Sequence, residues 1–357
     1  MKQAVERANG YVSRLAEDIG ERHPGSASNR SATEFAAGVL AAAGWSVETP
    51  EFDCLDWNAS GASLEAGGRS FDVLPGPYSL PVECEAPLRV VSTGEELAAV
   101  AESGDAAGCV LLIRGEAAAE QLFPKRFPFY QVPEHLEMYR LIEAARPAAV
   151  VAATARNPEA AGAVYPFPMI EDGDFHIPNG YMRDVEGDRL AASSGTARLS
   201  IRSRRINSTA RNVIARRGDN HAQRLILTGH IDSKYGTPGA LDNASGVATL
   251  LIAAELLGRR EPNRPVEILL LNGEDYYAAS GQLHYLETVG VLPATVSLAV
   301  NVDAVGLRDH RTAFSLYELP SDLEPSVRGA LDRRPDLIEG PSWYQSDHMV
   351  FVQSGVP

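Results

Sequence analysis

The fold is decided by a short apolar run that ends in polar residues, Arg224-Leu-Ile-Leu-Thr-Gly-His230-Ile-Asp232-Ser233. The run has the composition and length of a buried strand, and a glycine stands before its polar end. The strand therefore delivers an imidazole and a carboxylate where a sheet opens to solvent. Further along, Asp242 lies in a turn of small residues that leads into the apolar, helix-like stretch Val247–Leu257.

Two further apolar strands follow the same plan. Val266–Leu271 runs into the adjacent carboxylates Glu274 and Asp275, and the run that begins at Ser297 ends at Asp303. Strands separated by helix-length segments predict right-handed crossovers and a mainly parallel, mixed sheet flanked by helices, an α/β fold. The carboxyl ends of such strands lie at one edge, where open sheets bind their ligands. We therefore expect these side chains to converge there.

The polar residues at the strand ends suit a metal site. His348 adds a second imidazole to that of His230 and to three or more carboxylates, a ligand set that suits Zn²⁺, with Co²⁺ or Mn²⁺ as substitutes. Taken singly, a histidine at a strand end is usually structural, and an aspartate before a helix is usually an N-cap. Adjacent Glu274 and Asp275, however, repel one another and lose hydration unless a cation neutralises one of them. The whole set predicts a two-metal hydrolase site.

The motifs resemble those of the co-catalytic zinc aminopeptidases, a family that includes bacterial leucyl aminopeptidases, glutamate carboxypeptidase and glutaminyl cyclases. The resemblance covers residues 224 to 351, and Arg22-His-Pro-Gly-Ser26 is similar to the family's N-terminal segment. Its motifs are Gly-His-x-Asp-Ser, Gly-Ala-x-Asp-Asn-Ala-Ser-Gly-Val-Ala, Asn-Gly-Glu-Asp, Asn-x-Asp and Ser-Asp-His-x-x-Phe.

The resemblance implies a set of metal ligands. Asp242 would bridge two zinc ions. His230 and Asp303 would complete the ligands of one ion, and Asp275 and His348 those of the other. The resemblance thus implies a zinc-exopeptidase-like fold with two Zn²⁺ as cofactors.

It also implies the chemistry. Glu274 would act as the general base, and Asp232 would hold His230 in the correct tautomer. The implied activity is hydrolysis of peptide or amide bonds by a hydroxide that bridges the two ions, as in an aminopeptidase. The family usually has Glu-Glu where this chain has Glu274-Asp275, so either the backbone approaches more closely here or that ion is bound more weakly.

Other functions stay open on the sequence alone. The same scaffold serves a carboxypeptidase, an N-acyl amino-acid deacylase or a glutaminyl cyclase, because specificity depends on the groups that bind the substrate's free amine or carboxylate. A non-catalytic binding module is a third interpretation. The motifs indicate neither the preferred side chain, nor the oxyanion donor, nor the oligomeric state.

Size and charge indicate a two-core protein and argue against some classes of binding partner. The chain has 357 residues, 45% of them hydrophobic, and can bury two cores. A formal net charge of −15 and a pI near 5.0 argue against nucleic acid or an anionic membrane as a partner. The N-terminus has no apolar leader and we expect no membrane span, which favours a cytoplasmic protein and leaves a secreted one as the alternative. Three widely spaced cysteines indicate no thiolate zinc site.

We expect a zinc peptidase domain at residues 1–49 and 204–357, interrupted by a small mixed β domain at residues 50–203. The insert has short apolar runs and two helical stretches, Glu95–Ser103 and Glu134–Ala145, and resembles a protease-associated domain. The family's closing strand and helix do not follow His348, so a truncated C-terminus is expected.

Overall fold

The computed structural model describes residues 2–154, 167–218, 223–259, 262–290 and 292–357. The chain forms two compact units, Met1–Cys54 with Ser208–Pro357, and Leu55–Asn207. The expected domain boundaries, after residues 49 and 203, differ from these by a few positions. The chain passes between the units along two long strands, β2 (Glu51–Ala66) and β9 (Thr196–Arg211). The assignment of the second unit as a protease-associated domain stays a prediction.

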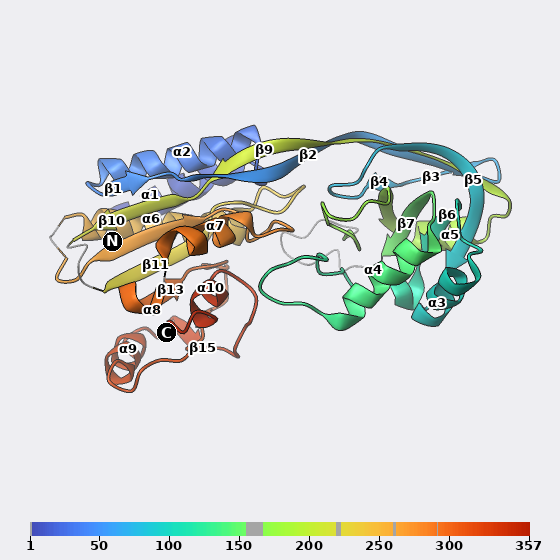
Figure 1. Ribbon diagram of the computed structural model, residues 1–357. Helices are drawn as coiled ribbons and strands as arrows, with labels where there is room; N and C mark the ends of the chain where they lie inside the picture. The colour runs from blue at the N-terminus through green and yellow to red at the C-terminus, as the bar shows by residue number, and fades with distance from the viewer. Residues whose placement is uncertain (1, 155–166, 219–222, 260–261, 291) are drawn as a thin grey trace. The chain divides into compact units, whose positions relative to one another are not determined.

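A five-stranded mixed sheet forms the centre of the first unit, in the order β1-β10-β12-β11-β13 (Figure 1). Strand β11 pairs in parallel with β12 and β13, whereas β10 is antiparallel to β1 and β12. The predicted mixed α/β fold is therefore confirmed, with parallel pairing confined to the three strands that have polar ends. The strands are β1 (Ser46–Glu48), β10 (Val213–Arg217), β11 (Arg224–His230), β12 (Val266–Leu271) and β13 (Val296–Asn301).

Helices pack on both faces of this sheet. Ile268 and Leu270 of β12 join a core with Leu251 of helix α6. Glu267 alternates with them and points to the other face, where it contacts Tyr285 of helix α7. The remaining elements of the unit are α1 (Lys2–Ser13), η1 (Arg14–Ile19), α2 (Ala27–Ala42), η3 (Ala240–Ser245), α6 (Gly246–Leu257), α7 (Ser280–Val289), α8 (Leu292–Thr295), β14 (Thr312–Phe314), α9 (Glu324–Leu331), β15 (Leu337–Glu339) and α10 (His348–Val352).

Helix α6 is apolar because it is a core helix. The stretch Ala240–Leu257 has the length and the mean hydropathy, 1.4, of a membrane span. Its residues Val247, Leu250, Leu251 and Ala254 are nevertheless buried against the sheet. The expectation that no segment approaches a membrane span is thus corrected. Packing against the sheet accounts for the apolar composition of Ala240–Leu257.

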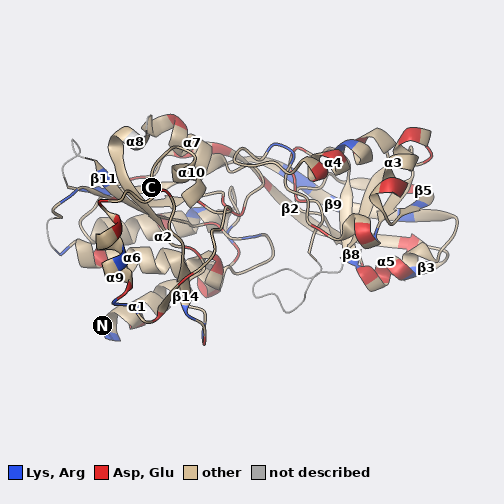
Figure 2. Ribbon diagram, turned by 90° about the horizontal axis from the view of Figure 1, so that it is seen from below, with Lys and Arg blue, Asp and Glu red and all other residues tan. Residues whose placement is uncertain are grey.

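The second unit has an eight-stranded sheet in the order β3-β2-β9-β5-β6-β7-β8-β4. Strands β6 and β7 are buried along their whole length. The two helical stretches expected in this region correspond to α3 (Gly94–Ser103) and α4 (Pro133–Ala145). Acidic residues occur in α3 and in α5 (Asp184–Ala191), as Figure 2 shows. The elements are β3 (Arg69–Phe71), β4 (Leu74–Pro75), β5 (Val82–Val91), α3 (Gly94–Ser103), β6 (Val110–Ile113), η2 (Gly115–Ala118), α4 (Pro133–Ala145), β7 (Ala149–Thr154), β8 (Asn179–Arg183) and α5 (Asp184–Ala191).

A buried ion cluster fixes the start of β12. The Glu267 carboxylate is fully buried, and the Nε atoms of Arg216 and Arg224 lie 2.7 and 3.0 Å from its Oε2. The Tyr285 hydroxyl donates a hydrogen bond of 2.7 Å to Oε1. Burial and this carboxylate together raise the pKa of Tyr285, which therefore stays protonated. The cluster joins β10, β11 and α7 through one side chain.

We predict that Glu267→Gln lowers the free energy of unfolding by about 3–5 kcal/mol, because removing one partner leaves buried charge uncompensated. Urea unfolding followed by circular dichroism measures the loss. Glu324→Gln is the control: its ion pair with Arg328 is exposed, so its loss should change the stability little. Equal losses for the two variants would contradict the role given to Glu267.

Candidate metal centre

His230 stands where the polar strand ends meet. It is the last residue of β11 and its side chain is fully buried. Because β11, β12 and β13 run parallel, the residues that follow them reach the same edge. Two groups of potential ligand atoms share this histidine, with all atoms of a group within 4.8 Å of one another: His230, Asp242 and Asp303, and His230, Glu274 and Asp275. The structure therefore brings these five predicted site residues together.

On one side, two carboxylates approach the same ring nitrogen. Asp242 Oδ1 lies 3.0 Å from His230 Nε2, and Asp303 Oδ1 lies 3.4 Å from it. The Ser346 hydroxyl donates a hydrogen bond of 2.7 Å to the other oxygen of Asp303. This bond fixes the rotation of the Asp303 carboxylate and leaves Oδ1 directed at the histidine.

Asn243 ties the turn that carries Asp242 to the segment that carries Asp303. Its Nδ2 donates to the Val302 carbonyl at 3.0 Å, and its Oδ1 accepts from the Ala304 amide at 3.2 Å. A Cβ at position 246 would lie 2.1 Å from Asn243 Oδ1 and 2.3 Å from the Val302 oxygen. Gly246 is therefore required for the close approach, which explains the small residues of this motif.

Asp232 organises the opposite side. Its two oxygens accept hydrogen bonds from the Gly273 amide at 2.8 Å and the Asp275 amide at 3.1 Å. His230 Nδ1 lies 3.6 Å from Asp232 Oδ1, which is beyond a good hydrogen bond. In this structure Asp232 thus holds the turn that presents Glu274 and Asp275, and its expected role in setting the tautomer of His230 stays a prediction.

The electrostatics of the cluster show an excess of negative charge. Burial raises the pKa of Glu274 well above its usual range, and burial together with Asp242 raises the pKa of Asp275 to about 7. Burial alone would lower the pKa of His230, but Asp303, Asp232 and Asp242 outweigh it and raise that pKa well above the ordinary value. A bound cation would relieve this repulsion.

The donor set fits zinc. Both ring nitrogens of His230 are buried without a hydrogen bond of good geometry among the described residues, although a carboxylate oxygen lies 3.0 Å from Nε2. An imidazole surrounded by carboxylate oxygens and lacking such bonds is suited to coordination, and imidazole with carboxylate is a ligand combination that zinc accepts. The residues present therefore fit a divalent metal at this edge of the sheet, the metal edge, where His230, Asp242, Asp303, Glu274 and Asp275 meet.

His348 lies beside the cluster without joining either group of described residues. It begins α10, and its Nε2 lies 2.5 Å from the Trp343 carbonyl oxygen. Its ring packs on Tyr317 with centroids 4.7 Å apart. Burial lowers the pKa of His348, whereas the Trp343 carbonyl and nearby Asp303 act to raise it. Its assignment as the sixth contributor to the site stays a prediction.

Sequence reasoning missed two charged residues near the cluster. Asp347 is buried, accepts a 2.8 Å hydrogen bond from Gln282, and has its pKa raised to about 7, chiefly by burial. Its place in the Ser-Asp-His motif was the available signal. Arg22 is also fully buried and bonds to the segment that follows β11. The similarity of residues 22–26 to the family's N-terminal segment was the available signal, although it assigned no role to the arginine.

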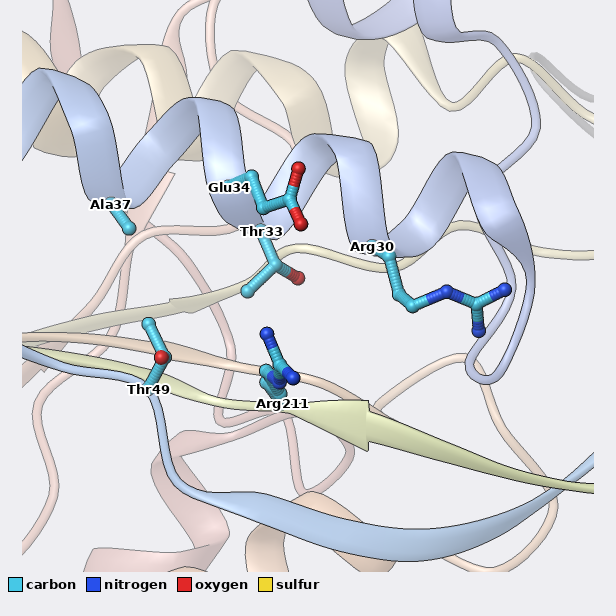
Figure 3. Close-up of a pocket in the computed structure, with 6 residues that line it drawn as sticks. All are labelled: Arg30, Thr33, Glu34, Ala37, Thr49 and Arg211. Atoms are coloured by element: carbon cyan, nitrogen blue, oxygen red, sulfur yellow. The ribbon is translucent and has the colours of Figure 1, made fainter.

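A separate hollow of about 200 Å³ lies beside α2, lined by Arg30, Thr33, Glu34, Ala37, Thr49 and Arg211 (Figure 3). The Arg30 side chain extends away from Arg211, and each guanidinium already has a partner, the Gly25 carbonyl and the Glu51 carboxylate respectively. None of the predicted metal ligands lines this hollow. The chemistry-bearing residues are therefore those around His230.

Known proteins are similar to this chain in sequence. Residues 212–357 match the model of Peptidase family M28. A probable lipoprotein aminopeptidase, LpqL, of Mycobacterium tuberculosis is 23% identical over 94% of this chain and 63% of its own length. Probable leucine aminopeptidase 2 of Aspergillus fumigatus is 28% identical over 84% of this chain and 60% of its own length. The chain thus spans less than two thirds of either relative.

Solved structures give the same fold. The zinc aminopeptidase BSAP of Bacillus subtilis superposes with a TM-score of 0.76 at 21% identity, over 98% of this chain and 83% of that one. All the predicted site residues lie within the segment that matches the family model. The resemblance seen in the sequence motifs is therefore confirmed: residues 212–357 match the model of Peptidase family M28, and the fold is that of a zinc aminopeptidase.

Proposed function

We propose that this protein is a metal-dependent aminopeptidase that uses two zinc ions. The observation that carries the proposal is the convergence of Asp242, Asp303, Glu274 and Asp275 on His230 in two compact groups of potential ligand atoms. The match of residues 212–357 to a peptidase family model supports peptides as substrates, and the names of both curated relatives support removal of N-terminal residues.

We assign five residues as metal ligands and one as the general base. His230, Asp242 and Asp303 would hold one ion, and Asp275 with the shared Asp242 and His348 would hold the other. Two zinc ions held there would lower the pKa of a water and polarise the carbonyl of the scissile bond.

Glu274 is proposed as the general base. It belongs to the cluster but is left out of the proposed ligand set, so its carboxylate remains available to a water at the metal edge. Burial disfavours its charged form and makes the carboxylate a stronger proton acceptor. It would take a proton from the attacking water and return it to the leaving amine.

Metal content tests the ligand assignment. We expect the purified protein to hold two zinc ions, and removal by a chelator to abolish hydrolysis of leucine p-nitroanilide until zinc is restored. Asp242→Asn should lower the zinc content at both positions, because this carboxylate is proposed to bridge them. Asp336→Asn, which changes an exposed carboxylate paired with Arg334, is the control. Full turnover by protein free of metal would refute the proposal.

Glu274→Gln should lower kcat by about 10²–10⁴, the usual contribution of a general base, while zinc content stays at the wild-type level. Steady-state kinetics and elemental analysis on the same preparation separate the two effects. Glu287→Gln, an exposed position on α7, should change neither. Loss of zinc together with activity would show that Glu274 is a ligand and not the base.

A substrate panel tests the exopeptidase type. Peptides and anilides with a free N-terminal amine should be hydrolysed, and N-acetylation should lower kcat/KM by about 10² or more, because a site built to bind a polar group rejects the analogue that lacks it. Release of C-terminal residues, deacylation of N-acyl amino acids, or cyclisation of N-terminal glutamine would each replace the aminopeptidase assignment. Bound zinc without turnover of any substrate would favour a binding module.

A further inference from the structure

The segment between η1 and α2 contains a buried cation, Arg22, that bonds to the loop between His230 and Asp242. Arg22 is fully buried, in a stretch that has no regular secondary structure. Burying a guanidinium is costly unless its donors are satisfied. Burial lowers the pKa of Arg22 to about 10, against the opposing effect of Asp232, Asp275 and Asp242, so the side chain remains charged at neutral pH.

The guanidinium bonds to the backbone between His230 and Asp242. Its Nε donates to the Ile231 carbonyl at 2.8 Å, Nη1 to the Pro238 carbonyl at 2.7 Å, and Nη2 to the Gly239 carbonyl at 2.8 Å. The Arg22 amide donates to Ser233 Oγ at 3.1 Å. The loop that joins two of the proposed metal ligands is thus folded around one planar group with donors in several directions.

The Arg22 guanidinium packs so closely on this loop that residue 239 has no room for a side chain. A Cβ at position 239 would lie 2.9 Å from Arg22 Nη2 and 2.4 Å from the Ser233 Cβ. Gly239 also has a φ of +54°, a conformation that favours glycine. The close approach of the guanidinium and the special backbone therefore occur together, directly before the turn that carries Asp242.

The same segment reaches the second ligand loop. Asn29 Nδ2 donates to the Arg22 carbonyl and to Asn272 Oδ1, both at 2.8 Å, and Asn272 Nδ2 donates back to Asn29 Oδ1 at 2.7 Å. All these side chains are fully buried. Asn272 directly precedes Gly273 and the pair of carboxylates at the end of β12. One short stretch of the N-terminal region is thereby bonded to both loops that supply the site.

We propose that Arg22 is a positioning residue, which holds the Ile231–Gly239 loop so that Asp242 and His230 are set for metal binding. The inference rests on the proposed function, since it concerns the same site. Lysine keeps the charge but concentrates its donors on one nitrogen, so it cannot reproduce the planar fork that reaches three carbonyls. The geometry of the guanidinium, more than its charge, is what the loop requires.

The test measures zinc affinity by competition with a chromophoric chelator, on the full chain stripped of metal, at a temperature below the unfolding of every variant. Arg22→Lys and Arg22→Gln should each bind zinc about 10–100-fold more weakly, the usual cost of losing a partner that orients ligands. The control is Arg216→Gln, which weakens the Glu267 cluster at the opposite end of β12 and lowers stability without touching the ligand loops. It should bind zinc as the wild type does.

Kinetics give a second measurement. At saturating zinc, Arg22→Lys should lower kcat with little change in KM, because the metal edge is altered and the substrate contacts are not. If the Arg22 variants fail to fold, Ser233→Ala replaces them. It removes the hydrogen bond from the Arg22 amide and the longer one to the Thr237 carbonyl, both of which hold this loop, and should weaken zinc binding about fivefold or more.

The outcomes separate the two proposals. Wild-type zinc affinity in the Arg22 variants, or in Ser233→Ala where those do not fold, would overturn the positioning role and leave the proposed function intact. An equal loss of affinity in Arg216→Gln would also overturn it, because the effect would then be one of general stability. Absence of zinc binding by the wild type would overturn the proposed function, and the positioning role with it.

Discussion

Repulsion between carboxylates at one edge of a sheet is the constraint on which the arrangement of this protein depends. Asp242, Asp303, Glu274 and Asp275 share a single imidazole as their central neighbour. Two unit charges 4 Å apart interact by about 4 kcal/mol at the effective dielectric constant of a protein surface. A chain that gathers several such pairs needs both a rigid scaffold and a compensating cation, and the raised pKa values of Glu274 and Asp275 express that need.

The buried carboxylates at the two ends of β12 differ in how their charge is balanced. At its start, Glu267 is balanced by two arginines and a tyrosine hydroxyl. At its other end, Arg22 is a nearby buried cation, and its side chain donates hydrogen bonds to the backbone carbonyls of Ile231, Pro238 and Gly239. The contrast is consistent with a structural role for the first cluster, which is balanced by its own cations, and with the proposal that a metal ion would complete the second.

Much of the first unit could be predicted from the sequence, because its strands and α6 are apolar runs bounded by glycine and polar residues. The convergence of His230, Asp242, Glu274, Asp275 and Asp303 followed from parallel pairing. The antiparallel half of the sheet did not, since an apolar run such as Val213–Arg217 carries no information about the direction of its partner. The contacts of Asp232 and Arg22 were hidden for a related reason: their partners are backbone groups, which leave no mark on side-chain patterns.

The shorter carboxylate at position 275 illustrates what the backbone contributes to the site. An aspartate where the related enzymes usually have glutamate either approaches through its backbone or binds its ion weakly. Asp232 accepts hydrogen bonds from the amides of Gly273 and Asp275, which draws this turn toward the end of β11. Asp275 then reaches the group that contains His230 and Glu274 in spite of the missing methylene. Asp232 thus holds the backbone of this turn beside the end of β11, where the shorter aspartate already lies within reach of His230 and Glu274.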